Sequence, residues 1–185
     1  TSTGTWISPR SLASIYSRVT YDYMKRYLFA VNFRRDGSSR FAKGSKWGIF
    51  PSFSAAWRIS EEDFMRDISS IDQLKLRASW GRTGNERIPS SIGRFLYLPQ
   101  YGTENVVMDG SLVTGVMQTR MANPNLTWET VQSSDIGIDF AFLNNSIFGE
   151  FDLYTKDTKD ILLSLAIPKF VGLNPPHQNV GVVRN

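Results

Sequence analysis

The sequence contains no cysteine and only one histidine, His177. Disulfides and cysteine-based metal sites are therefore excluded, and a lone histidine leaves no cluster for zinc, so we expect neither metal nor cofactor. The sequence also lacks a Gly-x-Ser-x-Gly elbow, a phosphate-binding glycine loop and a His-Glu-x-x-His motif, so we expect that the chain is not an enzyme. Glu61, Glu62 and Asp63 follow Ser60, and acids in the first turn of a capped helix explain them better than an acid/base site does.

Long apolar runs are missing as well. No stretch approaches the ~18 apolar residues that a membrane helix needs, and the mean hydropathy is −0.25. A membrane β-barrel stays possible, because its strands alternate lipid-facing and lumen-facing residues and average to ordinary hydropathy. The aromatic content of 13% suits the interfacial girdles of such a barrel, although the core of a soluble β-sandwich could also use it.

Positive charge is in modest excess, with a net charge of +4. Five basic residues lie close together: Arg34, Arg35, Arg40, Lys43 and Lys46. A nucleic-acid surface is one interpretation of such a cluster. The residues surround the polar stretch Asp36-Gly37-Ser38-Ser39, which is typical of a loop, so we favour a solvated loop and expect no nucleic-acid partner.

Alternation with a period of two residues is the strongest pattern present, and it recurs in at least six segments. Residues 15–23 alternate, Met24-Lys25-Arg26 reads as a tight turn, and residues 27–34 alternate again. Each segment presents one face rich in aromatic side chains. The pattern predicts a β-hairpin.

The clearest segment covers residues 47–60, which is long enough to cross a membrane because a spanning strand needs ~9–11 residues. Trp47 and Trp57 share one face near the two ends of this segment, as paired aromatic girdles would. The register predicts that Phe53 and Trp57 face lipid while Ser54 and Arg58 face the lumen. Pro51 cannot donate to a ladder, and we expect a bulge there.

The rest of the chain alternates strands with turns. Ser60 should cap one short helix that carries Phe64, Ile68 and Ile71 at helical spacing, and residues 74–81 should form the next strand. Residues 82–126 lack sustained alternation and predict a long loop with short hairpins in it. The expected elements that follow are a strand at 135–142, a turn at 143–146, a strand at 147–154, an apolar run at 161–167 and a strand from 179 to 184.

Several motifs occur in the order found in one family. They are Phe33-Arg34-Arg35-Asp36-Gly37-Ser38-Ser39-Arg40-Phe41, Trp47-Gly48-Ile49-Phe50-Pro51-Ser52, Ser54-Ala55-Ala56-Trp57-Arg58-Ile59-Ser60-Glu61-Glu62, Leu74-Lys75-Leu76-Arg77-Ala78-Ser79-Trp80-Gly81 with Thr83-Gly84-Asn85, and Asn123-Pro124-Asn125-Leu126-Thr127-Trp128-Glu129-Thr130. Phe142-Leu143-Asn144-Asn145 and residues 154–160 fit the same family. Over roughly residues 12 to 185, with 86 to 120 the least similar part, the chain closely resembles the SusC/RagA family of TonB-dependent transporters.

The resemblance implies an all-β fold: antiparallel strands that form part of a large transmembrane β-barrel in the outer membrane of bacteria of the Bacteroides type, with long extracellular loops. It also implies a plug driven through TonB, a SusD-like surface lipoprotein as partner, and import of a bulky nutrient such as a glycan or peptide. The chain begins without Met and ends inside an alternating run, so we expect residues 1–185 to be a partial barrel domain without plug, TonB-contacting segment or closing strands. Six or seven strands would be about a third of the ~22 in a plugged transporter.

No residue is assigned to substrate from the sequence. Five charged residues should face the lumen: Arg58, Arg77, Asp139, Glu150 and Asp152. His177 is expected to be a solvated loop residue, and Trp128 and Tyr101 fit girdle or loop packing better than stacking on a sugar. The alternative for the whole chain is a soluble β-rich adhesion or binding module, in which the aromatic faces would be a core.

Overall fold

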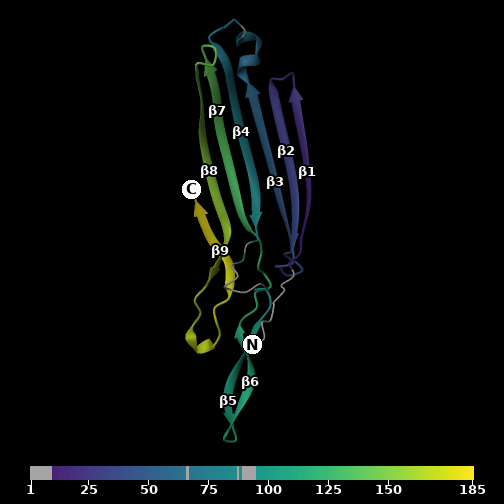
Figure 1. Ribbon diagram of the computed structural model, residues 1–185, viewed down its shortest axis with the longest axis vertical. Helices are drawn as coiled ribbons and strands as arrows, with labels where there is room; N and C mark the ends of the chain where they lie inside the picture. The colour runs from purple at the N-terminus through teal and green to yellow at the C-terminus, as the bar shows by residue number, and fades with distance from the viewer. Residues whose placement is uncertain (1–9, 66, 87, 89–94) are drawn as a thin grey trace, which may run out of the picture.

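The computed structural model describes residues 10–65, 67–86, 88 and 95–185, and it is dominated by one long, open antiparallel sheet (Figure 1). The sheet has seven strands in the order β1-β2-β3-β4-β7-β8-β9. Their bounds are β1 Leu12–Tyr23, β2 Tyr27–Ser38, β3 Trp47–Arg58, β4 Ile71–Asn85, β7 Glu129–Phe142, β8 Ile147–Ser164 and β9 His177–Arg184. Every neighbouring pair is antiparallel. No helix in the described residues is long and apolar enough to cross a membrane.

A second, two-stranded sheet consists of β5 (Gln100–Met108) and β6 (Ser111–Arg120). It is inserted between β4 and β7, and Figure 1 shows it projecting beyond one end of the main sheet. Asp109 and Gly110 close this hairpin with positive φ angles of 50° and 73°, as a two-residue primed turn requires. The expected hairpin within the long loop is confirmed.

Tight turns close one end of the main sheet. Met24 and Lys25 have φ of 55° and 58°, and the Arg26 N–H donates to the Tyr23 carbonyl oxygen at 3.0 Å. Asn144 and Asn145 take the same left-handed conformation in the turn between β7 and β8. The opposite end carries the long connections 86–128 and 165–176. Outer-membrane barrels of the kind that the chain resembles have short periplasmic turns and long external loops, so the resemblance assigns the turn end to the periplasm and the loop end to the outside.

The register separates the sheet into two chemically different faces. The apolar face carries cross-strand rows such as Val19, Val31, Phe53 and Trp80, and, one row on, Tyr21, Phe29, Ala55, Ala78, Ile136 and Leu153. The polar face carries the alternate residues, for example the row Thr20, Ala30, Ser54, Ser79 and Asp135. Large apolar side chains stay solvent-accessible on the apolar face, with Phe53 at 55% and Leu153 at 65% exposed. The register therefore agrees with the predicted placement of Phe53 and Trp57 on one face and Ser54 and Arg58 on the other.

Three local expectations are wrong. Pro51 makes no bulge against β2, since the pairing runs without a shift from Tyr27↔Trp57 to Gly37↔Trp47. The ladder to β4 begins only at Ser52↔Gly81, so Pro51 lies just outside it, where a missing N–H costs little.

The expected helix at Ser60 is replaced, within the described residues, by two three-residue 3-10 helices, η1 (Ile59–Glu61) and η2 (Asp63–Met65). No described side chain, that of Ser60 included, caps η1. Ile71 already belongs to β4.

Strands also run further than alternation indicated. β2 continues to Ser38, so Arg34 and Arg35 lie in a strand rather than in a solvated loop. β4 continues to Asn85, and β8 is one strand of 18 residues that includes the start of the apolar run predicted separately at 161–167. Because about 9–11 residues suffice to cross, such strands extend beyond the bilayer at the loop end.

A compact core forms at the loop end, where the long connections fold together. Its buried members are Phe41, Phe50, Ile88, Leu96, Leu126 and Trp128, with Leu162 packed against them. The Trp128 ring centroid lies 5.2 Å from that of Phe41 and 5.4 Å from that of Phe50, and its indole N–H donates to the Lys46 carbonyl oxygen. This loop core is the main buried cluster of the part of the chain that the structure describes, and it gives the external end a fixed shape.

Candidate functional site

The polar face carries a group of six charged residues on three adjacent strands. They are Lys75 and Arg77 on β4, Asp135 and Asp139 on β7, and Glu150 and Asp152 on β8. Period-two alternation places each of them on one side, because their positions within each strand differ by two or four residues. We call this group the charged ladder.

Arg77 is the centre of the charged ladder. Its Nε donates to Asp139 Oδ1 at 2.7 Å, and its Nη2 donates to Asp152 Oδ2 at 3.0 Å. Glu150 Oε2 lies 3.4 Å from the same Nη2, and Asp135 Oδ1 lies 3.9 Å from Nη1. A single guanidinium therefore connects β4 to both β7 and β8, using its planar array of donors.

Gly137 makes this connection possible. It lies between Arg77 and Asp152 in one cross-strand row, and a Cβ at Gly137 would collide with Asp152 Oδ1 and lie 3.0 Å from Arg77 Cζ. The glycine leaves the space through which the arginine reaches across a whole strand. Its role here is this close approach, since no left-handed conformation is recorded for it.

Carboxylates outnumber cations in the charged ladder, with four acids against Lys75 and Arg77. Lys75 is occupied by Asp139 at 3.0 Å. Glu150 keeps 73% of its side chain exposed, whereas that of Asp139 is 19% exposed. The wall thus presents a negative surface, and a wet polar face of this kind suits contact with water or a charged partner rather than burial in lipid.

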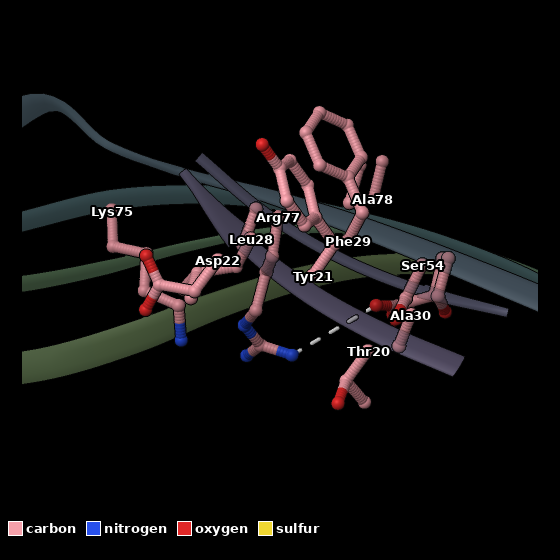
Figure 2. Close-up of a pocket in the computed structure, with 14 residues that line it drawn as sticks. Thr20, Tyr21, Asp22, Leu28, Phe29, Ala30, Ser54, Lys75, Arg77 and Ala78 are labelled. Carbon is pink, nitrogen blue, oxygen red and sulfur yellow. Dashed lines mark ion pairs between the residues drawn. The ribbon is translucent and has the colours of Figure 1, made fainter. Parts of the chain in front are cut away.

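A hollow of about 490 Å³ adjoins the charged ladder. Small side chains leave this space on the polar face, chiefly Thr20, Ala30, Ser54, Ala56 and Ser79. Figure 2 shows Tyr21 and Phe29 projecting from one side of the strands and Thr20 and Arg77 from the other, with the Arg77–Asp135 ion pair drawn as a dashed line. The hollow is a shallow depression on the polar face of the sheet.

The predicted lumen-facing residues are largely brought together. Arg77, Asp139, Glu150 and Asp152 meet in the charged ladder, whereas Arg58 lies at the periplasmic margin and reaches the Lys25 carbonyl oxygen at 3.4 Å. Alternation in the sequence also places Lys75 on the same face as Arg77, and Asp135 on the same face as Asp139, and the structure brings both into the charged ladder. No role was predicted for either residue.

The structure places the aromatic and histidine candidates in different environments. Trp128 is 4% exposed inside the loop core, which confirms loop packing. Tyr101 on β5 is 65% exposed. His177 was expected to be solvated, and this is wrong: it is 9% exposed where β9 begins, because Asn123 and Asn179 tie the loops over this part of the sheet. Its Nδ1 has no hydrogen-bond partner among the described residues.

Glu62 is a structural hub that the sequence did not reveal. Tyr27 Oη and Trp57 Nε1 donate to Glu62 Oε1 at 2.8 and 2.9 Å, and Arg26 pairs with Oε2 at 3.0 Å. The hydrogen bond from Tyr27, that from Trp57 and the charge of Arg26 lower the pKa of the Glu62 carboxyl, although desolvation opposes them. Tyr27 and Trp57 also stack at 6.4 Å, so Glu62 fixes the polar edges of the periplasmic aromatic girdle. The acid/base interpretation and the helix-dipole interpretation of Glu62 are both replaced by this role.

Comparison with known proteins agrees with this geometry. The family model described as TonB dependent receptor-like, beta-barrel, matches residues 2–185. The chain belongs to this family. It is 41% identical over 174 residues to TonB-dependent receptor P26 of Formosa agariphila, covering 94% of the chain and 17% of that protein. It is 38% identical over 179 residues to TonB-dependent receptor SusC of Bacteroides thetaiotaomicron, covering 95% of the chain and 18% of SusC.

Solved structures give the same result for this TonB-dependent receptor barrel. The RagAB peptide transporter matches with a TM-score of 0.80 and 27% identity, over 95% of the chain and 19% of the transporter chain. The RagAB peptide importer in the 'open-open' state matches with a TM-score of 0.81. The chain is thus similar to less than a fifth of the length of each relative. The expected family, the all-β barrel architecture and the outer-membrane location are confirmed, and the relatives are receptors and transporters rather than enzymes. The soluble-module alternative is set aside.

No group of three or more His, Cys, Asp or Glu side chains that could hold a metal occurs in the described residues.

Proposed function

We propose that this chain supplies part of the wall and external loops of an outer-membrane transporter that imports a bulky nutrient, a glycan or a peptide, with energy delivered through TonB. In this proposal residues 1–185 form one part of the barrel domain, and the plug and the remaining strands lie outside them. The observation that carries the proposal is the division of one sheet into an exposed apolar face and a charged polar face, on strands long enough to cross a membrane.

The width of the complete barrel and the charge of the polar face support the dependence on TonB. Seven strands with both edges open cannot close on their own, and a barrel several times larger encloses a lumen too wide to select by size. Such a lumen must be plugged, and the outer membrane has no energy source of its own to open a plug. The negative charged ladder offers this wall a surface for a polar plug or for solvent.

The external end supports capture of a large substrate with a surface lipoprotein of the SusD type. The β5–β6 hairpin projects beyond the wall and exposes Tyr101, Val107, Leu112 and Val116 at 65%, 66%, 70% and 74%. Exposed apolar groups on a projecting loop mark recognition surfaces more often than structural ones. The similarity to the RagAB peptide transporter favours a peptide among the possible cargoes.

Deletion of the gene for the full-length transporter tests the proposal. Growth on one oligomeric nutrient should be abolished while growth on its monomer continues. Each candidate nutrient is supplied once as oligomer and once as monomer, and complementation with the intact gene is the control. Uptake by the intact transporter that continues at full rate in a strain without TonB would contradict the proposal.

A further inference from the structure

One arginine lies on the apolar face at its loop end. Arg35 pairs across the sheet with Ile15 on one side and Ile49 on the other, which are 62% and 51% exposed. Arg35 is itself exposed, and its guanidinium carbon lies 4.8 Å from the centroid of the Trp47 ring, a cation–π distance. A charged group thus sits among side chains that otherwise belong to the lipid-facing band.

Other arginines near this end have acidic partners. Arg34, the preceding residue, points to the polar face and pairs with Asp36 at 2.8 Å, and Arg184 pairs with Asp157 at 2.7 Å. Arg35 has no such ion pair within the part of the chain that the structure describes. A cation on a lipid-facing surface is costly unless it finds water or an anion, and a side chain of arginine's length reaches the headgroup layer to do so.

The height of Arg35 determines which anion it can meet. Trp47 begins β3 at the external end and is 46% exposed on the apolar face, where girdle tryptophans mark the boundary between hydrocarbon and headgroups. At this boundary the abundant anions are the phosphates of membrane lipids, and guanidinium groups bind phosphate oxygens in a bidentate manner. Trp47 holds the guanidinium against the wall and limits its rotamers before a lipid arrives.

We propose that Arg35, stacked on Trp47, forms a binding site for the phosphate group of an anionic lipid in the outer leaflet of the outer membrane. The apolar side chains of Ile15, Phe33 and Ile49 lie beside and below the guanidinium, where they would contact the acyl chains of the same lipid. This site requires the chain to be part of a membrane barrel, and it does not require the barrel to import any particular nutrient.

Lipid binding by the purified full-length protein tests this site. The protein in detergent is titrated with bisphosphorylated lipid A and, separately, with the same lipid after removal of both phosphates, and bound lipid is counted by native mass spectrometry. Arg35→Gln should weaken binding of the phosphorylated lipid about fivefold, the contribution of one basic residue near an anionic membrane surface. Trp47→Leu should weaken it less, because the charge remains. Arg18→Gln, which removes an equal charge from the polar face of β1, should leave it unchanged.

The outcomes separate this site from the proposed function. Equal binding of the phosphorylated and dephosphorylated lipid by the wild-type protein would overturn the site, as would equal losses in Arg35→Gln and Arg18→Gln. If Arg35→Gln does not assemble, Arg35→Lys is compared with the wild-type protein instead. A measurable loss of phosphate-dependent binding in Arg35→Lys supports the site, because lysine keeps the charge but not the bidentate geometry. No loss in both Arg35→Lys and Trp47→Leu overturns it. Nutrient uptake in the Arg35→Gln strain should stay near wild type, so a failed uptake experiment would bear only on transport.

Discussion

An arginine placed at Phe53 tests which face of the sheet meets lipid. Phe53 lies between Trp47 and Trp57 on β3, it is 55% exposed on the apolar face, and its ring stacks on Trp80 at 5.1 Å. An arginine on the lipid face near the bilayer midplane costs ~2–4 kcal/mol. Loss of the aromatic pair adds ~0.5–1.5 kcal/mol. The Phe53→Arg variant should therefore lose about 2.5–5.5 kcal/mol of unfolding free energy.

Ser54→Arg is the matched control, because the neighbouring residue faces the other way. Ser54 lies between Ala30 and Ser79 in the hollow of about 490 Å³, with Asp135 in the same row to receive the new charge. Its cost should stay below about 1 kcal/mol. Phe53→Leu removes the ring without adding charge and isolates the aromatic part. The assay is unfolding of the full-length protein in lipid vesicles by guanidinium chloride, compared through its midpoints. Equal losses for Phe53→Arg and Ser54→Arg would refute the assignment of faces.

Three further predictions concern the girdle, the charged ladder and the loop core. Glu62→Gln should make the stability of the protein fall less steeply as the pH is lowered. The lowered pKa of Glu62 stabilises the fold above the ordinary carboxyl pKa, and this contribution is lost as pH falls through the folded-state pKa. Melting temperature against pH measures this, with Glu61→Gln as control, and an unchanged profile for Glu62→Gln would contradict the hub role. Gly137→Ala should cost about 1–3 kcal/mol by displacing Arg77 from Asp152. Gly115→Ala is the control and should be nearly neutral, because its Cβ would meet nothing closer than 3.7 Å. The same denaturation assay compares the two variants, and similar costs would argue against the close approach at Gly137. Trp128→Ala should cost about 3–5 kcal/mol and lower assembly, while Tyr101→Ala should leave assembly intact and act on capture alone, as cell-surface abundance and uptake would show. The reverse pattern would mean that Trp128 is a ligand contact.

For the membrane-spanning part of the strands, the sequence was sufficient to predict which side chains lie on which face of the sheet. Alternation there has a single physical cause, lipid on one side and water on the other, so the parity of Phe53, Ser54, Asp139 and Asp152 follows from the residues alone. The charged ladder could be predicted as a set of lumen-facing charges. Its bonding pattern could not, because the pairing of β4 with β7 depends on a register across a long insertion.

Outside the membrane this cause is absent. Residues 154–160 of β8 are polar on both faces, so no alternation marks that the strand continues. The burial of His177 depends on loops folding over it from residues 123 to 127, which no local pattern encodes. Glu62 lies two residues after Ser60, between Glu61 and Asp63, as in the first turn of a capped helix. The Tyr27 hydroxyl, the Trp57 indole N–H and Arg26 nevertheless offer its carboxylate better partners than a helix terminus does.

The insertion of residues 86–128 between two adjacent strands also bears on how such barrels diversify. The β1–β2 and β7–β8 pairs close through turns of a few residues, whereas β4 and β7 must find one another across about forty. Closure entropy grows only with the logarithm of loop length, so the longer connection costs roughly 2 kcal/mol more than a tight turn. The fourteen register pairs between β4 and β7 far outweigh that difference. The segment can therefore be lengthened, shortened or exchanged while β4 and β7 beneath it keep their register.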